Sequence, residues 1–312
     1  MVQPTFIIAG ERRCGTTSLY SWMGAHPQVY LHPRADENYF VDDAVGGRQW
    51  REGRIDEAAW DRDHDVTSYA TLFKGATGQP AVGHKGADLL YWRPAHARIA
   101  RLVPDVRLVI SLRDPVTRAW SQYWNEVGKG REDLSFERAI AEEDRRCQRS
   151  DWANFHLAYI RRGFYEKSLE HLFQHVDRSR VIVTTVEESR KQPREMMQRV
   201  YRFLGIDPER GLEFAGTRVN ENWTTVPREW VRGPLRPLER GYSRIVDAIT
   251  RRTTQDPERR RQMRRKLARP FRRPASGIQL PDEVRDQLRA LYRPHIRALE
   301  TLVGRSFAEW DT

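Results

Sequence analysis

The chain has 312 residues and a formal net charge of +11, a length that suits one large α/β domain or two small ones. It contains no run that approaches the ~18 apolar residues of a membrane span, and the residues before Gly10 are too few and too polar for a signal peptide. Two cysteines, Cys14 and Cys147, indicate neither a disulfide framework nor a cysteine metal site. We therefore expect a soluble, cytoplasmic protein.

The positive charge is concentrated in one segment. Residues 228–273 contain sixteen Arg or Lys and five Asp or Glu, and the rest of the chain is balanced. The stretch "RRRQMRRKLARPFRR" (259–273) is either a solvated surface helix or a lid or docking surface for an anion, a membrane or nucleic acid. The first interpretation is favoured because nucleic-acid motifs are absent from the sequence. We expect one domain over 1–312, with a basic helical insertion or lid at 228–278.

The predicted elements alternate between strands and helices. Apolar runs predict strands at 6–9, 28–31, the start of 80–92, 106–112 and 180–188. Helical spacing predicts helices at 16–25, from His96 onward, at 115–128, 135–145, 151–174, 193–206 and 281–303. This alternation predicts an α/β fold, a single P-loop-like domain whose mostly parallel central sheet has helices on both faces. The helix within 279–312 is expected to pack back on the core.

The stretch "FIIAGERRCGTTSLY" (6–20) has the pattern of a phosphate-binding loop. Gly10 and Gly15 bracket a turn at the start of a helix, where backbone N–H groups and the helix dipole attract anions. A triphosphatase loop would continue with Lys and then Ser or Thr, but here the cations lie inside the turn. The candidate ligands are Arg12, Arg13, Cys14, Gly15, Thr16, Thr17 and Ser18. The alternative is an ordinary strand–helix turn with solvated arginines.

A second candidate anion site lies in "VISLRDPVTRAWSQY" (109–123). Arg113 follows a buried strand, and Ser121 lies two turns along the next helix. The carboxyl ends of parallel strands are where open sheets bind ligands, so this pair is expected near the first loop. The alternative is that Arg113 only pairs with Asp114. Two phosphate-type sites on one edge indicate a nucleotide with phosphates at both ends.

Together, these motifs resemble the sulfotransferase family that uses 3′-phosphoadenosine 5′-phosphosulfate, especially its bacterial and carbohydrate-type members. The resemblance covers most of residues 5–220 and then 280–310, and it implies that Arg113 and Ser121 hold the 3′-phosphate. It also implies sulfuryl transfer to a hydroxyl or amine of a small-molecule or carbohydrate-like acceptor. Arg13 would stabilise charge on the departing oxygen. The loop lacks the Lys-[Ser/Thr] pair of metal-dependent phosphoryl transfer, so we expect no required metal.

The resemblance leaves the general base open among three residues. Relatives often carry Lys-Glu-x-x-Phe-Phe after the second strand, and "RADENYF" (34–40) is the corresponding stretch here. Its alignment places Asp36 at the base position, whereas a one-residue slip would make it Glu37. His84, in "GHKGADLLYW", is the third candidate. The alternative for both acids is a capping or solvated role.

Further residues follow from the same resemblance. Lys85 matches a lysine that lines the acceptor site, and Arg218 is a candidate ligand of the 3′-phosphate. Two other classes of function stay open from the residues alone, a nucleotide kinase and, less favoured, a basic nucleic-acid-binding protein. The prediction is a small-molecule or carbohydrate acceptor and no nucleic-acid partner, with a possible anionic surface contacting 259–273.

Overall fold

The computed structural model describes residues 2–34, 36–41, 60–61, 63–217, 225–227, 236–254, 259, 263, 266–267, 272–275 and 278–310. The chain divides into two compact units. The first consists of Met1–Gln122, Ser135–Asn220 and Leu280–Thr312, and the second of Tyr123–Leu134 and Glu221–Gln279. The domain boundaries expected from the sequence stay a prediction.

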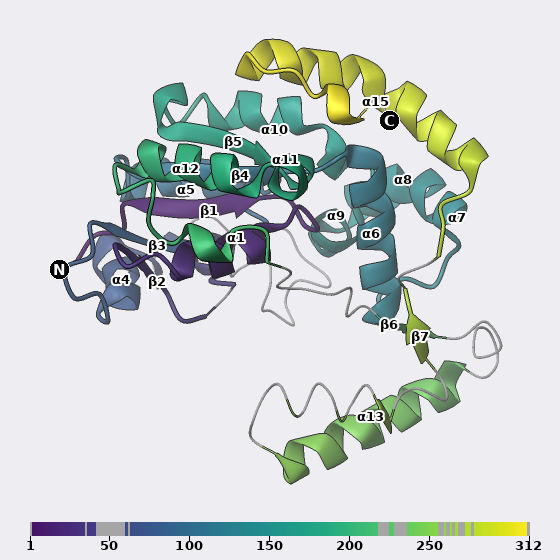
Figure 1. The fold of residues 1–312 in the computed structure, drawn as a ribbon. Helices are drawn as coiled ribbons and strands as arrows, with labels where there is room; N and C mark the ends of the chain where they lie inside the picture. Colours follow the sequence, from purple (N-terminus) through teal and green to yellow (C-terminus); the bar gives the residue numbers. More distant parts are fainter. Residues whose placement is uncertain are drawn as a thin grey trace. The chain divides into compact units, whose positions relative to one another are not determined.

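The first unit is built on a five-stranded parallel sheet (Figure 1). Its strand order is β2-β3-β1-β4-β5, and the strands are β1 (Phe6–Gly10), β2 (Val29–Leu31), β3 (Ala81–Lys85), β4 (Arg107–Leu112) and β5 (Val181–Thr185). β1 lies in the centre, where Phe6 is paired with Gly83 on one side and Arg107 on the other. The predicted parallel α/β fold is confirmed.

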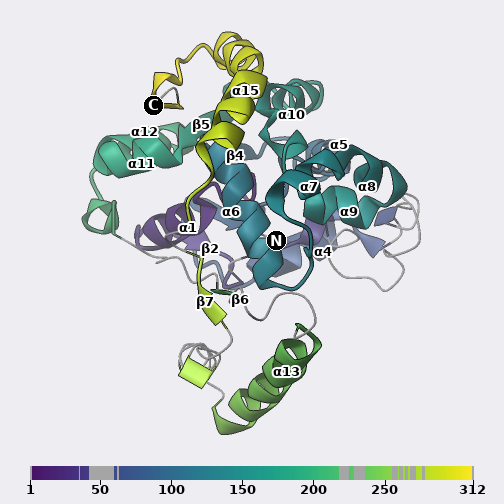
Figure 2. The ribbon, with the colours of Figure 1, turned by 90° about the vertical axis from the view of Figure 1, so that its right-hand side faces the viewer.

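Helices cover both faces of this sheet because the side chains of the buried strands alternate between two apolar clusters. Ile7 and Ala9 of β1 belong to one cluster, and Phe6 and Ile8 to the other. The first cluster is covered by α5 (Arg93–Leu102), α10 (Tyr165–Leu172) and α15 (Asp282–Val303), and the second by α1 (Thr16–Gly24) and α12 (Pro193–Leu204). Figure 2 shows α1 and α12 on one side of the strands and α5 and α10 on the other.

The remaining helices of the first unit are mostly short. They are α4 (Val66–Ala70), α7 (Phe136–Ala141), α8 (Glu143–Arg149), α9 (Asp151–Leu157) and α11 (Val186–Lys191). The longer α6 (Pro115–Gly128) follows β4, and α15 packs along α10. In the second unit, β6 (Thr225–Pro227) and β7 (Arg272–Pro274) pair antiparallel, and α13 spans Arg236–Thr253.

The structure corrects the helix predicted at 151–174, which is two helices with a 3₁₀ turn between them. The carboxylate of Glu143 causes the break. It accepts hydrogen bonds from the backbone N–H groups of Tyr159, Ile160 and Arg161 at 2.7 to 2.9 Å. These N–H groups are therefore unavailable for continuous helical bonding.

A second correction concerns the strand predicted at 180–188. β5 ends at Thr185, whose Oγ1 accepts from the backbone N–H of Glu188 at 3.0 Å, so the following residues begin α11 instead. A Thr followed three residues later by Glu is a helix start signal. The segment 135–145 is likewise divided, between α7 and α8.

Candidate active site

The loop between β1 and α1 depends on two glycines. Gly10 has a φ of 149°, and a Cβ atom there would lie 2.4 Å from the carbonyl oxygen of Ser111 on β4. Gly15 has a φ of 78° and precedes α1 without a side-chain cap. The first backbone N–H groups of α1, at Thr16 and Thr17, therefore stay available for an anion at the positive end of the helix.

Arg13 joins this loop to the second predicted motif. Its φ of 70° is left-handed, a conformation that costs a non-glycine residue roughly 1–2 kcal/mol. Its Nε donates a hydrogen bond to Ser121 Oγ on α6 at 2.9 Å. The two motifs, more than a hundred residues apart in sequence, thus meet at the carboxyl edge of the sheet, as expected for an open parallel sheet.

Arg113, which directly follows β4, completes this cationic group. Its Nε donates to Thr117 Oγ1 at 3.1 Å and its Nη1 to the carbonyl oxygen of Arg13 at 3.4 Å. Within the described part of the chain, no carboxylate oxygen is within ion-pair distance of its guanidinium. Burial lowers the pKa of Arg113, as does the charge of Arg190, whereas the nearby carboxylates of Glu187 and Asp114 act in the opposite direction. A partly buried cation in this position favours an incoming anion.

Lys85 and Asp36, the residues predicted for the acceptor side, lie beside Thr17 of the loop. Lys85 ends β3 and is almost completely buried, and its Nζ donates to Thr17 Oγ1 at 3.3 Å. The same nitrogen lies 2.6 Å from Oδ1 of Asp36, a side chain that is 57% exposed. The backbone N–H of Glu37 donates to the carbonyl oxygen of Lys85 at 2.9 Å. This bond holds the 36–37 segment beside the end of β3.

Glu37, the second candidate base, has different surroundings. Its side chain is buried, and Oε1 accepts from the backbone N–H of Asn38 at 3.0 Å. Oε2 lies 3.6 Å from His32 Nδ1 and 3.5 Å from Arg34 Nη1. Its carboxylate therefore faces a histidine and an arginine of its own segment, whereas Asp36 faces Lys85.

His84, the third candidate, is enclosed by aromatic rings. Its ring packs against Phe40, Tyr69 and Phe73 at centroid distances of 5.7 to 6.2 Å. Neither ring nitrogen has a hydrogen-bond partner, and burial lowers the pKa of His84 to about 3. Because neighbouring residues of a strand point to opposite faces, His84 faces away from the side on which Lys85 meets Asp36.

Two loop residues direct their side chains away from the expected anion. Arg12 Nε donates to Asp88 Oδ1 at 2.5 Å, and its Nη1 donates to His156 Nδ1 at 3.0 Å. The Cys14 thiol is buried, which raises its pKa to about 12. At Arg12 and Cys14, a ligand of the loop would therefore contact the main chain rather than the predicted side chain. The predicted ligand Arg218 lies outside the described residues.

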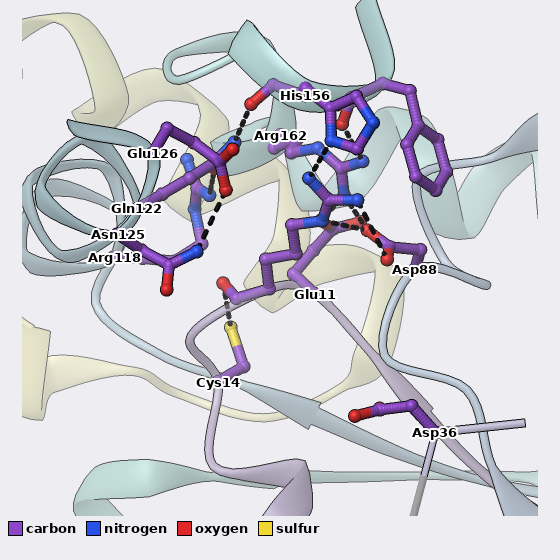
Figure 3. A network of polar contacts seen from close by, with 12 residues as sticks. Glu11, Cys14, Asp36, Asp88, Arg118, Gln122, Asn125, Glu126, His156 and Arg162 are labelled. Atoms are coloured by element: carbon purple, nitrogen blue, oxygen red, sulfur yellow. Dashed lines mark hydrogen bonds and ion pairs between the residues drawn. The ribbon is translucent and has the colours of Figure 1, made fainter. Parts of the chain in front are cut away.

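A buried polar network lies beneath the loop and was not predicted (Figure 3). Arg162, which is fully buried, donates to Glu11 Oε2 at 2.7 Å and lies 3.0 Å from Asp88 Oδ1. Arg12 reaches the same aspartate and stacks over Phe155 at 4.5 Å. The one sequence signal was Glu11 itself, an acidic residue directly after Gly10 in an anion-binding loop. Figure 3 shows Asp36 apart from this network.

The described residues form neither a candidate metal cluster nor a membrane-spanning helix. They contain no group of three or more His, Cys, Asp or Glu that could hold a metal ion. None of the described helices is long and apolar enough to cross a membrane. The cytoplasmic location expected from the sequence stays a prediction.

Comparison with known proteins gives consistent matches. The chain is 29% identical over 203 residues to human heparan sulfate glucosamine 3-O-sulfotransferase 3B1, covering 65% of this chain and 46% of that protein. It is 24% identical over 212 residues to the mouse bifunctional heparan sulfate N-deacetylase/N-sulfotransferase 4, covering 66% and 22%. The chain thus spans less than half the length of these two relatives.

A solved structure shares the fold. A sulfotransferase from Alicyclobacillus acidocaldarius aligns over 100% of both chains with a TM-score of 0.67 and 22% identity, which supports the architecture alone. The profile of the sulfotransferase family matches residues 4–210, a segment that includes the anion-binding loop, Arg113 and Ser121. On these grounds the chain belongs to the sulfotransferase family.

Proposed function

We propose that this protein transfers a sulfuryl group from 3′-phosphoadenosine 5′-phosphosulfate to a hydroxyl or amine of a carbohydrate-like acceptor. The observation that carries the proposal is the convergence of Arg13, Arg113 and Ser121 at the carboxyl edge of the sheet. A donor with phosphate groups at both ends requires two cationic positions that are close together but distinct. The loop and the start of α6 supply them.

The donor-binding residues divide between the two ends of the nucleotide. We assign the 5′-phosphosulfate to the backbone N–H groups of Thr16 and Thr17, to their hydroxyls, and to Arg13. We assign the 3′-phosphate to Arg113 and Ser121. Arg113 has a planar guanidinium that suits phosphate, and its lack of an ion-pair partner among the described residues leaves its charge for the ligand.

The acceptor-side residues support in-line transfer with a general base. We assign the base to Asp36, which would take the proton of the acceptor hydroxyl or amine as that atom bonds to sulfur. Lys85 Nζ lies 2.6 Å from the carboxylate and 3.3 Å from Thr17 Oγ1, so it links the base to the donor loop. As the bond from sulfur to the bridging oxygen breaks, Arg13 and the loop N–H groups would stabilise the charge on the leaving oxygen.

The acceptor class comes from the relatives. The names of the two relatives described above refer to heparan sulfate, a carbohydrate. Among the described residues, the exposed carboxylate of Asp36 leaves the acceptor side open to a polar molecule. We therefore propose a carbohydrate-like acceptor. The transfer assay will show whether the sulfuryl group goes to a hydroxyl or to an amine.

Calorimetric titration with 3′-phosphoadenosine 5′-phosphate, beside ADP with and without Mg²⁺, tests the proposal. We expect tight binding of the bisphosphate without Mg²⁺ and much weaker binding of ADP. Preferential, Mg²⁺-dependent binding of ADP or ATP would favour the nucleotide kinase instead. Sulfate transfer from labelled donor to a panel of amino sugars and glycans, with phenols as a comparison set, then identifies the acceptor.

A further inference from the structure

Glu11 is the residue of the donor loop whose chemistry the proposed function leaves unexplained. It lies between Gly10 and Arg12, and its side chain is completely buried. Oε2 accepts from Arg162 Nη1 at 2.7 Å, but Oε1 has no hydrogen-bond partner. An ionised carboxylate in such a place would normally have all its acceptor sites filled.

The charges around Glu11 are few and close. Arg162 lies between the carboxylates of Glu11 and Asp88, at 2.7 and 3.0 Å. Arg12 shares Asp88, with contacts of 2.5 and 3.2 Å. Arg162, Arg12 and the nearby Arg118 carry three positive charges against the one negative charge of Asp88, and ionised Glu11 would offset one of the two that remain. The charge state of Glu11 therefore sets the net charge beneath the loop (Figure 3).

We propose that Glu11 is a proton-linked positioning residue of the donor loop, holding the loop through Arg162 and becoming neutral when the donor's sulfate or phosphate group binds. This inference rests on the proposed function, because it needs an anion on the loop. The proton comes from solvent, and no bond of the donor or the acceptor changes. Glu11 itself contacts Arg162 rather than the reacting atoms, so its role is positioning.

The direction of the pH dependence follows from burial. Burial raises the pKa of Glu11 to about 7, and the charges of Arg162 and Arg118 only partly oppose this. An ionised Glu11 repels an incoming anion, so donor affinity should fall as the pH rises through this value. The titratable and charged groups facing Glu11 are Arg162, Arg118, Asp88, Cys14, Tyr91 and Tyr165. Of these, the thiol and the two phenols have raised pKa values and stay neutral at pH 6–8.

Calorimetric titration of 3′-phosphoadenosine 5′-phosphate at pH 6, 7 and 8 tests the inference. At pH 7, two buffers of different ionisation enthalpy report the protons taken up. The wild-type protein should take up protons at pH 7, and its Kd should rise from pH 6 to pH 8 by roughly fivefold more than that of Glu11→Gln, the effect over this range of a one-unit rise in a pKa near 7. The ligand's own phosphate ionisation contributes equally to both proteins.

Two further variants separate charge from shape. Glu11→Asp retains a carboxyl group and should keep the extra pH dependence even if the affinity is lower. Glu166→Gln is the matched control, because Glu166 is also buried, with one oxygen 2.6 Å from Nδ1 of His295 and the other without a hydrogen-bond partner. This control should retain the wild-type pH dependence.

The outcomes are distinguishable. The inference is wrong if Glu11→Gln keeps the pH dependence of the wild-type protein. It is also wrong if the wild-type protein takes up no protons when the bisphosphate binds, a result that does not require Glu11→Gln to fold. If the wild-type protein does not bind the bisphosphate at any pH, the proposed function itself fails.

Discussion

At the residue scale, Arg113 and Arg13 have separate tasks in the proposed site. Arg113 is a partly buried cation without an ion-pair partner among the described residues, which suits a ligand charge present in the ground state. Arg13 is held in a left-handed conformation that aims its Nε at Ser121. Equilibrium binding and turnover can therefore tell the two arginines apart.

Replacing Arg113 by Ala should weaken binding of 3′-phosphoadenosine 5′-phosphate by ~1.5–3 kcal/mol, the scale of a hydrogen bond to a charged group. ADP lacks the 3′-phosphate and should lose little affinity. Calorimetry on both ligands checks the expectation. Equal losses would remove Arg113 from the 3′-phosphate site.

Arg13→Ala should lower kcat by ~10²–10³, the range for removing one donor to a developing oxyanion. Its effect on donor affinity should be smaller, because the charge it stabilises grows mainly in the transition state. Steady-state kinetics combined with a binding titration measures the two effects. Weaker binding with unchanged turnover would make Arg13 a ground-state ligand only.

Asp36→Asn should reduce turnover by ~10²–10⁴, the usual loss on removing a general base, while donor binding is kept. Glu37→Gln is the neighbouring control and should have a much smaller effect, since its carboxylate faces His32 and Arg34. His84 is neutral above pH ~4, because burial lowers its pKa to about 3. Near-full turnover of Asp36→Asn with an inactive Glu37→Gln would reverse the assignment.

At the scale of elements, one carboxylate separates α9 from α10. Glu143 accepts three consecutive backbone hydrogen bonds from residues 159–161, and it is almost completely buried. Its removal would leave these N–H groups without their acceptor, although the segment can relax in part.

Glu143→Ala should lower the free energy of unfolding by ~2–4 kcal/mol, since an unsatisfied buried polar group costs about 1–3 kcal/mol. Urea denaturation measures this loss. Glu142→Ala is the adjacent control. Glu142 pairs with Arg145 at the surface, so its loss should change stability by less than ~1 kcal/mol. If Glu143→Ala lowered the free energy of unfolding as little as Glu142→Ala, Glu143 would not be the residue that stabilises the turn between α9 and α10.

At the scale of the whole molecule, the donor motifs and the basic segment lie in different units. The loop, Arg113 and Ser121 belong to the first unit, whereas α13 belongs to the second. Arg251 and Arg252 are exposed at the end of α13.

Replacing Arg251 and Arg252 together by Gln should therefore leave the Kd for 3′-phosphoadenosine 5′-phosphate unchanged within about twofold, because none of the residues assigned to the donor belongs to the second unit and physiological salt screens exposed charges. Calorimetry at physiological ionic strength checks this. A large loss of affinity would place the basic segment in the donor site.

The sheet and the donor motifs could be predicted because their signals are local. Apolar runs indicate strands, and Gly10 and Gly15 indicate a turn whose positive φ angles favour glycine. The break between α9 and α10 could not be predicted from the sequence. The backbone groups that Glu143 binds lie sixteen to eighteen residues further along the chain, and the spacing of apolar residues does not show that a side chain will bind the backbone of another segment. The same holds for Glu11 and Arg162, which are separated by 151 positions. The pairing of Asp36 with Lys85 also required the fold.

The central position of β1 has a consequence for biosynthesis. β1 pairs with β3 and β4, which both follow it in the chain, so one of its edges stays open until residues up to Lys85 have been made and the other until residues up to Leu112 have been made. Arg162, the partner of Glu11, emerges later still. The donor loop is therefore synthesised well before the residues that complete it. During that interval, an apolar strand with unpaired edges is exposed to aggregation.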